Sequence, residues 1–237
     1  MTGLASDTAM VLAAGLGTRM RPLTNDRPKP LVEVAGKALI DHALDKLADA
    51  GIATAVVNVH HFGDAVERHV RGRTVPRIAI SDERDLLLET GGGLVRAQSL
   101  LPDPFFCVNS DNVWIDGPSD AFQELSTAWD ATRMDALLLL VPHSGARNFA
   151  GKGDFEMGEG GLLARRAGES APLVFTGIQL IAKRLLRDAP EGAFSTNVLW
   201  DRAISEGRLY GAVFSGQWFE VGDPQAIGPT EAALAGG

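Results

Sequence analysis

Glycines and basic side chains gather in one short stretch near the start of the chain. An apolar run at residues 10–14 precedes Gly15 and Gly17, and four cations follow, Arg19, Arg21, Arg27 and Lys29. A glycine-rich turn lets backbone N–H groups approach a phosphate, because glycine has no Cβ and tolerates positive φ. In a chain whose net charge is −8, this local positive charge predicts a site for a polyanionic small molecule.

Prolines flank the last of these cations, since Lys29 lies between Pro28 and Pro30. They restrict the backbone on both sides of the lysine. The stretch fits neither common glycine motif: the dinucleotide-binding fingerprint needs a small residue where Met20 stands, and the phosphate-binding loop needs Gly-Lys-Ser/Thr. A surface loop with solvated arginines is the simpler alternative, and the coincidence of glycines, cations and prolines argues against it.

Two later segments also carry groups that could bind a ligand. The glycine triplet at residues 91–93 is expected to open a helix that runs to about residue 101, and free N–H groups at a helix start suit an anion or a polar base edge. Asp111 follows an apolar run at residues 105–108, a predicted buried strand. A carboxylate at the carboxyl end of a central strand is well placed to bind a metal ion that accompanies phosphates.

Predicted strands and helices alternate along the chain. We expect a parallel sheet covered on both faces, with ligands at the carboxyl ends of its strands. Residues 153–164 are expected to form short antiparallel strands outside this sheet. From apolar periodicity, strands are predicted at residues 10–14, 53–59, 77–81, 105–108, 136–141, 173–182, 209–214 and 217–221, and further helices at 37–50, 63–70, 121–129, 195–206 and 225–234.

Composition excludes several classes of protein. The 22 basic and 30 acidic residues disfavour nucleic acid as the main partner, because its binding draws on basic surface. One cysteine, Cys107, excludes an intramolecular disulfide and a cysteine-based zinc site. No apolar run approaches the roughly 20 residues that a membrane helix needs, and residues 1–8 do not resemble a signal peptide. We therefore expect a cytoplasmic protein with no membrane partner.

Four segments stand in a fixed order, and together they resemble the sugar-1-phosphate nucleotidyltransferase family. The resemblance extends from residue 10 to about residue 233. Its finer features, Leu-Glu-Thr-Gly-Gly-Gly and Gly153-Asp154-Phe155, are most similar to the uridylyltransferases that act on N-acetylmuramic acid 1-phosphate in bacterial cell-wall (peptidoglycan) recycling. The four segments are Leu-Ala-Ala-Gly-Leu-Gly-Thr-Arg-Met-Arg-Pro-Leu-Thr at 12–24 with Pro-Lys-Pro at 28–30, Leu-Glu-Thr-Gly-Gly-Gly at 88–93, Asn-Ser-Asp at 109–111, and Trp-Phe-Glu-Val-Gly-Asp-Pro at 218–224.

The resemblance implies a fold and a reaction. The fold is α/β, a Rossmann-like three-layer α/β/α arrangement with a mixed sheet and a small inserted sugar-binding β portion. Residues 1–237 would form one domain, with the nucleotide-binding core at about 10–141 and the sugar-binding portion and second metal segment at about 142–237. The reaction joins a nucleoside triphosphate, with UTP favoured, to a sugar 1-phosphate and releases pyrophosphate, with Mg²⁺ as cofactor.

The family's functional residues map onto this chain by motif. Arg19 would hold the β- and γ-phosphates, Lys29 would lie between the α-phosphate and the incoming phosphate, and Asp111 would bind Mg²⁺. The nucleotide would contact these two cations and Leu12, Ala13, Ala14, Gly15, Gly17, Thr18, Glu83, Glu89, Thr90, Gly91 and Gly92. The candidates for sugar binding are Asn109, Asn148, Asp154, Thr176, Gly177 and Asn197.

One position departs from the family's pattern. The second metal ligand is usually an aspartate in Trp-x-Asp-x-Gly-Thr-Pro, whereas this chain has Glu220 there and Asp223 in place of the threonine. A glutamate carboxylate lies one methylene further from the backbone. Either Glu220 or Asp223 could therefore be the second ligand.

Other functions remain open from the sequence. A guanylyltransferase for a mannose- or heptose-type 1-phosphate is the nearest alternative, followed by a cytidylyltransferase for phosphocholine-like substrates. A nucleotide-sensing module with an inactive site is an alternative of another class, and the presence of Arg19, Lys29 and Asp111 argues against it. A monomer and a homodimer are both compatible with the sequence.

Overall fold

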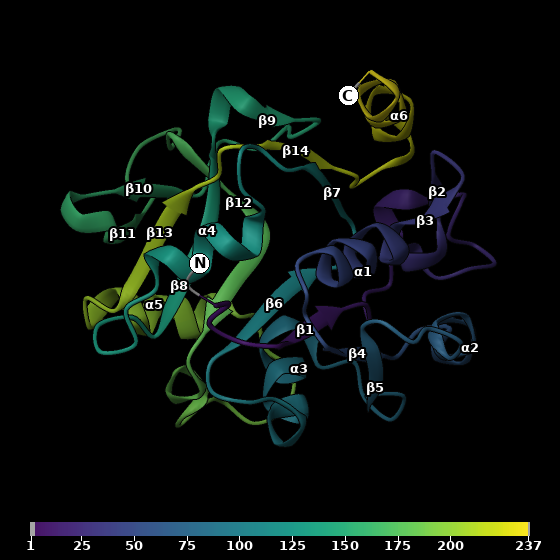
Figure 1. Ribbon diagram of the computed structural model, residues 1–237, viewed down its shortest axis with the longest axis horizontal. Helices are drawn as coiled ribbons and strands as arrows, with labels where there is room; N and C mark the ends of the chain where they lie inside the picture. Colours follow the sequence, from purple (N-terminus) through teal and green to yellow (C-terminus); the bar gives the residue numbers. More distant parts are fainter. Residues whose placement is uncertain (1–2, 237) are drawn as a thin grey trace.

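The computed structural model describes residues 3–236, which fold around a nine-stranded mixed sheet (Figure 1). Strand β1, at the centre, has β4 on one edge and β6 on the other, all three parallel. The neighbour of β6 on its far side, β12, runs antiparallel to it. The strands of this sheet are β1 (Thr8–Leu12), β4 (Thr54–Val59), β5 (Arg77–Asp82), β6 (Phe105–Asn109), β8 (Ala136–Pro142), β10 (Phe155–Met157), β11 (Leu163–Arg165), β12 (Leu173–Ile181) and β13 (Leu209–Val213).

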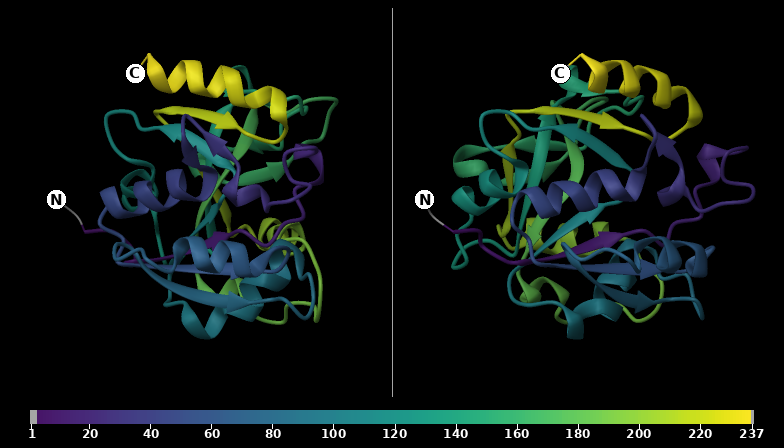
Figure 2. Two further views of the ribbon diagram at one scale, coloured as in Figure 1. Left: turned by 90° about the vertical axis from the view of Figure 1, so that its right-hand side faces the viewer. Right: turned by 45° about the vertical axis from the view of Figure 1, so that its right-hand side comes forward.

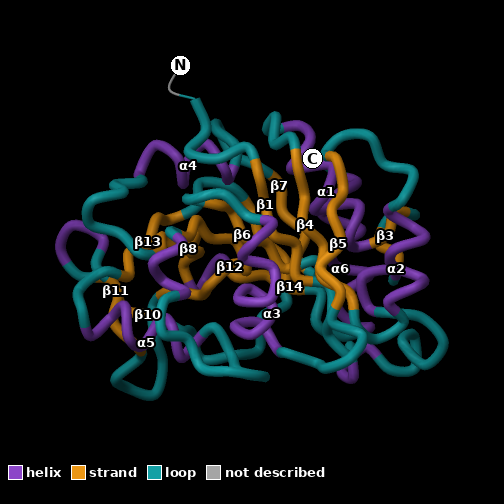
Figure 3. The backbone as a smooth tube through the Cα atoms, turned by 90° about the horizontal axis from the view of Figure 1, so that it is seen from below, coloured by secondary structure: helices purple, strands orange, loops and turns teal. Residues whose placement is uncertain are grey.

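Helices cover both faces of this sheet, as the alternating pattern predicts. On one face lie α1 (Leu39–Asp49), α2 (Gly63–Val70) and α4 (Ala121–Ala128). On the other lie α3 (Glu89–Ala97) and α5 (Asn197–Ser205), and Figure 3 shows the strands between these layers. Because successive strand residues point to opposite faces, Val11 of β1 packs in the first core and Met10 in the second.

The chain direction creates a crevice at the carboxyl ends of β1 and β6. From β1 the chain proceeds to β4 and β5 on one side, and it later returns to β6 on the other side. Such a reversal of strand order is where open α/β sheets bind ligands, because the loops after the two central strands diverge there. The loops after Leu12 and Asn109, both chemically distinctive in sequence, therefore meet at this point.

A second, three-stranded sheet carries the last motif to the same edge. Strand β14 (Gln217–Glu220) lies between β7 (Asn112–Ile115) and β9 (Ala146–Arg147). Helix α6 (Ile227–Ala235) lies beyond β14, as Figure 2 shows. A third core joins this sheet to Met20 and to the small hairpin of β2 (Glu33–Val34) and β3 (Lys37–Ala38). Residues more than 190 positions apart in the chain are thus held side by side.

The structure confirms the doubly covered, mixed sheet that the resemblance implies, whereas the all-parallel sheet expected from the alternating pattern is wrong, because β12 runs antiparallel to β6 and β8. Three further details are corrected. Residues 153–164 do not lie outside the main sheet, because β10 pairs with β12 at Leu173 and β11 pairs with β10. The first long helix begins at Leu39 rather than Lys37, since Lys37 and Ala38 pair with β2. Strand β7 was not predicted, because its four residues directly follow the Asn-Ser-Asp turn. Among residues 3–236, no helix is long and apolar enough to cross a membrane.

Candidate active site

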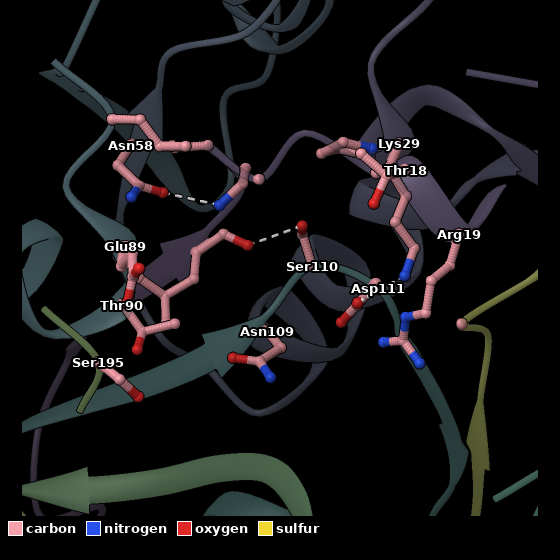
Figure 4. Close-up of a pocket in the computed structure, with 18 residues that line it drawn as sticks. Thr18, Arg19, Lys29, Asn58, Glu89, Thr90, Asn109, Ser110, Asp111 and Ser195 are labelled. Atoms are coloured by element: carbon pink, nitrogen blue, oxygen red, sulfur yellow. Dashed lines mark hydrogen bonds and ion pairs between the residues drawn. The ribbon is translucent and has the colours of Figure 1, made fainter. Parts of the chain in front are cut away.

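A cavity of about 440 Å³ opens at the carboxyl ends of β1 and β6 (Figure 4). In the close-up, Lys29, Arg19 and Asp111 lie toward one end, Glu89, Thr90 and Ser195 toward the other, and Asn109 between them. The lining therefore combines both predicted phosphate-binding cations with most of the predicted nucleotide contacts. The residues that line it are Leu12, Ala13, Ala14, Gly15, Gly17, Thr18, Arg19, Lys29, Pro30, Asn58, Leu87, Glu89, Thr90, Asn109, Ser110, Asp111, Ser195 and Gly222.

The turn after β1 depends on Gly17. Its φ of +63° is left-handed, and a Cβ at this position would lie 2.8 Å from Cβ of Lys29. Thr24 donates a hydrogen bond from Oγ1 to the Gly17 carbonyl at 2.9 Å, and the Met20 amide donates to the same oxygen at 3.0 Å. The glycine thus lets the turn pack directly onto the lysine that follows the arginine-rich loop.

Lys29 is held nearly buried at the edge of the cavity. Pro28 is extended, and Lys29–Leu31 forms a single 3₁₀ turn that begins at the lysine. Lys29 Nζ lies 2.7 Å from Oδ2 of Asp111, whose side chain is 33% exposed, compared with 11% for the lysine. The prolines therefore fix the backbone at the point from which the ammonium group reaches the acidic end of β6.

The turn after β6 is tied to β1 by a serine. The Ser110 amide and its Oγ both donate to the Leu12 carbonyl, at 3.1 Å and 2.8 Å. These bonds continue the β1–β6 pairing past the last strand residue and hold Asp111 at the cavity. These bonds therefore fix the position of Asp111 almost as firmly as that of a strand residue, although it lies in a loop.

A second ion pair joins the first loop to the last motif. Nη1 of Arg19 lies 3.4 Å from Oε1 of Glu220 at the end of β14. Asp223 instead accepts hydrogen bonds through Oδ1 from the amides of Gln225 and Ala226, at 2.9 Å and 3.2 Å, and caps the 3₁₀ turn before α6. Of the two candidates for the second metal ligand, Glu220 faces the loop that lines the cavity, and Asp223 serves the local backbone.

The donors around the cavity are compatible with Mg²⁺. Asp111 and Glu220 are carboxylates paired with the two cations that line the cavity, and Mg²⁺ typically binds one or two protein carboxylates together with substrate phosphates and water. Within residues 3–236, no group of three or more histidine, cysteine, aspartate or glutamate side chains could hold a metal by itself. A Mg²⁺ ion at this site would be held by these carboxylates together with phosphate oxygens and water.

A buried chain of hydrogen bonds supports the nucleotide-facing end of the turn. The Ala13 amide donates to Oδ1 of Asn58 at 2.7 Å, and Nδ2 of Asn58 donates to Oε1 of Glu83 at 2.9 Å. Glu83 is fully buried and does not line the cavity, while Asn58 does. Burial raises the pKa of the Glu83 carboxyl, and its hydrogen bond with Asn58 lowers it less. The structure therefore places Glu83 behind the cavity, where it would position Ala13 through Asn58.

Glu83→Gln is expected to make stability less dependent on pH. A carboxyl whose pKa is raised by folding contributes stability below its ordinary pKa of 4.5, and that contribution is lost as the pH rises through the raised value. The urea midpoint of the variant should therefore match wild type at about pH 4 and exceed it at about pH 8. Glu206→Gln, at an exposed position, is the matched control, and a variant less stable than wild type at the higher pH would contradict this assignment.

Sequence reasoning missed Asn58 and Ser195 as lining residues. Asn58 carries a recognisable signal, because it is the one polar side chain late in the predicted β-branched strand at residues 53–59. Ser195 carries none, since it lies in a loop 106 residues after Glu89 and is held at the cavity by hydrogen bonds between its neighbours, Phe194 and Thr196, and the start of α3.

The start of α3 differs from what the glycine triplet suggests. The amides of Gly91 and Gly92 donate to the Phe194 carbonyl, at 2.8 Å and 3.2 Å, so they are not free to hold an anion. A Cβ at Gly91 would overlap the Phe194 ring. Gly91 and Gly92 thus serve close packing and do not line the cavity, whereas Glu89 and Thr90 do. Glu89 has a φ of +58°, and this left-handed residue turns the chain into the helix.

Three predicted sugar-binding residues meet at the end of β6. Gly177, with a φ of +80°, lies where β12 has a bulge. A Cβ there would overlap the side-chain amide of Asn112 and approach that of Asn109. Thr176 is buried, and its carbonyl accepts from Asn112 Nδ2 and Trp218 Nε1 at 2.7 Å and 2.9 Å. Of these three residues Asn109 lines the cavity, and the Gly177 backbone packs closely against its side chain.

The other three candidates for sugar binding lie away from the main cavity. Nδ2 of Asn148 donates to Oγ1 of Thr230 at 3.0 Å, which ties β9 to α6. Asp154 accepts from the Phe175 amide through Oδ2 at 2.9 Å, and Asn197 accepts from Arg165 through Oδ1 at 3.0 Å. Asn148 and Asn197 thus have structural contacts where sugar contacts were expected. Asp154 lines a second cavity.

Comparison with known proteins agrees with this geometry. The model of the nucleotidyl transferase family matches residues 8–151. Among solved structures, the inositol-1-phosphate CTP transferase from T. maritima superposes with a TM-score of 0.82 over 99% of this chain and 97% of that chain. Its sequence identity is 16%, so this likeness concerns the fold alone.

Two curated relatives span nearly the whole chain. The N-acetylmuramate alpha-1-phosphate uridylyltransferase of Caulobacter vibrioides is 51% identical over 98% of both chains. The enzyme of the same name from Neisseria meningitidis serogroup B is 34% identical over 90% of this chain and 92% of its own. With the family match and the cavity at the ends of β1 and β6, they show that this chain belongs to the nucleotidyl transferase family and is a sugar-phosphate nucleotidyltransferase.

Proposed function

We propose that this enzyme transfers a uridylyl group from UTP to N-acetylmuramic acid 1-phosphate, with Mg²⁺, and releases pyrophosphate. The observation that carries the proposal is the 51% identity, over 98% of both chains, to a relative named for that reaction. The cavity supports it, because it gathers two cations, a carboxylate and a glycine-rich turn at the end of the central strands.

The chemistry requires two anionic groups to approach one another. A phosphate oxygen of the sugar 1-phosphate attacks the α-phosphorus of UTP, a new P–O bond forms, and the bond to the β-phosphate oxygen breaks as pyrophosphate leaves. No covalent enzyme intermediate is needed, so catalysis consists of positioning and charge stabilisation. Lys29, fixed between two prolines, would neutralise charge where the two phosphates meet, and Arg19 would hold the departing pyrophosphate.

The two carboxylates would hold the metal. Asp111 and Glu220 would bind Mg²⁺, which supplies positive charge to the phosphate oxygens. In the folded protein these carboxylates pair with Lys29 and Arg19. We propose that UTP and its metal replace these pairs, so that each cation turns to a phosphate without a large movement of the backbone.

The opposite end of the cavity would select the base. Ala13 and Ala14 follow β1 directly, and Glu89 and Thr90 line the same cavity. Asn58 holds the Ala13 amide from behind, which leaves carbonyl and amide groups of the turn to meet the edge of a pyrimidine. A guanylyltransferase or a nucleotide sensor would use the same cavity with a different base or without turnover.

A substrate matrix tests the proposal. Pyrophosphate release would be measured for UTP, GTP, CTP, ATP and dTTP, each with N-acetylmuramic acid, N-acetylglucosamine, mannose and glucose 1-phosphates, with and without Mg²⁺. We expect the highest kcat/KM for UTP with N-acetylmuramic acid 1-phosphate, and only with the metal. Preference for GTP with mannose 1-phosphate would establish the guanylyltransferase alternative, and UTP binding without release in every combination would support the sensor.

A further inference from the structure

A second cavity has three basic side chains among its seven lining residues. Its lining residues are Phe149, Gly151, Lys152, Gly153, Asp154, Arg165 and Arg166. It lies in the segment between β9 and β12, where Gly153, with a φ of +81°, turns the chain so tightly that a Cβ would overlap the Ala171 carbonyl. The turn is therefore a defined part of the fold.

Two of its cations, Lys152 and Arg166, have no acidic partner among residues 3–236. Nε of Arg165 lies 2.7 Å from Oδ1 of Asp201, and the guanidinium group lies over the rings of Phe155 and Trp200. The Arg166 side chain donates from Nη1 to the Gly153 carbonyl, at 3.1 Å. Among the described residues, Lys152 makes no side-chain hydrogen bond, and neither Lys152 nor Arg166 pairs with a carboxylate. Asp154 is the single acid in the lining, and the Phe175 amide donates to it.

Sheet pairing places this cavity next to the sugar-binding end of the active site. Strand β8 pairs with β12 at both ends of β12, so β6 and β10 share the opposite edge of β12. Segment 153–155 consequently lies directly beyond the carboxyl end of β6, where Asn109 lines the active site. Asp154 contacts the amide of Phe175, two residues from Gly177, and two strand residues span about 7 Å.

A second connection joins the two cavities through the segment before α5. Ser195 lines the active site, and its Oγ accepts from the Asn197 amide at 3.3 Å. Asn197 in turn accepts from Arg165, which lines the second cavity, through Oδ1 at 3.0 Å. The second cavity is thus separated from the active site by one strand segment and one short loop.

We propose that Lys152 and Arg166 bind a carboxylate of the sugar substrate, which makes the enzyme selective for sugar 1-phosphates that carry this second negative charge. The inference rests on the proposed function, since it assumes that a sugar 1-phosphate occupies the active site. N-acetylmuramic acid carries such a carboxylate on its lactyl ether, and N-acetylglucosamine is the same sugar without that group. Lys152 and Arg166 suit this role because neither pairs with a carboxylate of the described residues, although the chain as a whole is acidic. Hydrogen bonds between a cation and a carboxylate are charge-assisted, and they are stronger than hydrogen bonds between neutral groups.

The test compares the two sugars in Lys152→Met, Arg166→Met and the double variant at saturating UTP. For N-acetylmuramic acid 1-phosphate we expect KM to rise about tenfold in each single variant and about fiftyfold in the double variant, with kcat within about twofold. For N-acetylglucosamine 1-phosphate both constants should stay within about twofold of wild type. Lys152→Arg, which keeps the charge, should retain most of the preference for the acidic sugar.

Arg187→Met is the matched control, because Arg187 is an exposed cation outside both cavities. Equal losses on both sugars, or no loss on either, would overturn the inference. Glucuronic acid 1-phosphate and glucose 1-phosphate separate this failure from failure of the proposed function. If wild type uses glucuronic acid 1-phosphate but not N-acetylmuramic acid 1-phosphate, and the variants lose that activity, the proposed substrate is wrong and the inference stands. Turnover of neutral sugars alone would refute the inference.

Discussion

Lys29→Met is expected to lower kcat about a thousandfold while the Kd for UTP changes less than about tenfold. The reason is where the ammonium group lies. It is nearly buried, its backbone is restrained by two prolines, and it reaches Asp111 at 2.7 Å. A preorganised cation stabilises charge that develops in the transition state more than charge already present in bound UTP, which Arg19 and the backbone amides can also contact.

Lys46→Met controls for the loss of a partly buried lysine. Lys46 Nζ lies 2.5 Å from Oδ2 of Asp116, and neither residue lines the cavity. Its variant should keep kcat within about threefold of wild type. Thermal unfolding of both variants would show whether the fold is intact, and UTP binding would be followed by calorimetry. A Lys29 variant that loses UTP affinity as strongly as turnover would make the lysine a binding residue with no special role in the reaction.

Local pattern was enough to predict most of the fold. Short apolar runs separated by amphipathic stretches predicted the doubly covered sheet, because strands buried on both faces leave few other arrangements. Ligands were therefore expected at the carboxyl ends of the strands, and Gly17, Lys29 and Asp111 do lie around one cavity there. These residues could be predicted because each stands next to a strand end that its own segment defines.

Contacts between distant segments could not be predicted in the same way. The glycine triplet suggested an anion site, yet Gly91 and Gly92 are occupied by a carbonyl about 100 residues later in the chain. Nothing near residue 90 encodes that contact. Residues 153–164 were predicted to form strands outside the main sheet, because the segment is short and rich in glycine. Pairing of β10 with β12 instead joins them to that sheet. Polar residues such as Asn148 gave no local sign that their partner would be α6.

Asp111→Asn is expected to reduce Mg²⁺-dependent turnover at least about a thousandfold at millimolar metal. An amide oxygen is a weaker ligand for Mg²⁺ than a carboxylate, and Asp111 and Glu220 are the two carboxylates that would hold the metal. The structure also allows another role, because Asp111 contacts Lys29. If Asp111 only positioned that lysine, the variant would lose the same factor at every metal concentration. If Asp111 is a metal ligand, the substitution should instead raise the Mg²⁺ concentration needed for tight UTP binding.

Two further variants separate the carboxylates. Glu220→Gln is expected to weaken the same Mg²⁺ dependence, since Glu220 faces Arg19 at the cavity edge. Asp223→Asn should leave it unchanged, because asparagine caps a helix start about as well as aspartate and the cap is the contact that Asp223 makes. The reverse order, with Asp223 essential and Glu220 silent, would move the second ligand three residues along the chain. Both candidates lie at or just after the end of β14. Either result therefore identifies which carboxylate is the second metal ligand in a chain that has a glutamate at the usual aspartate position.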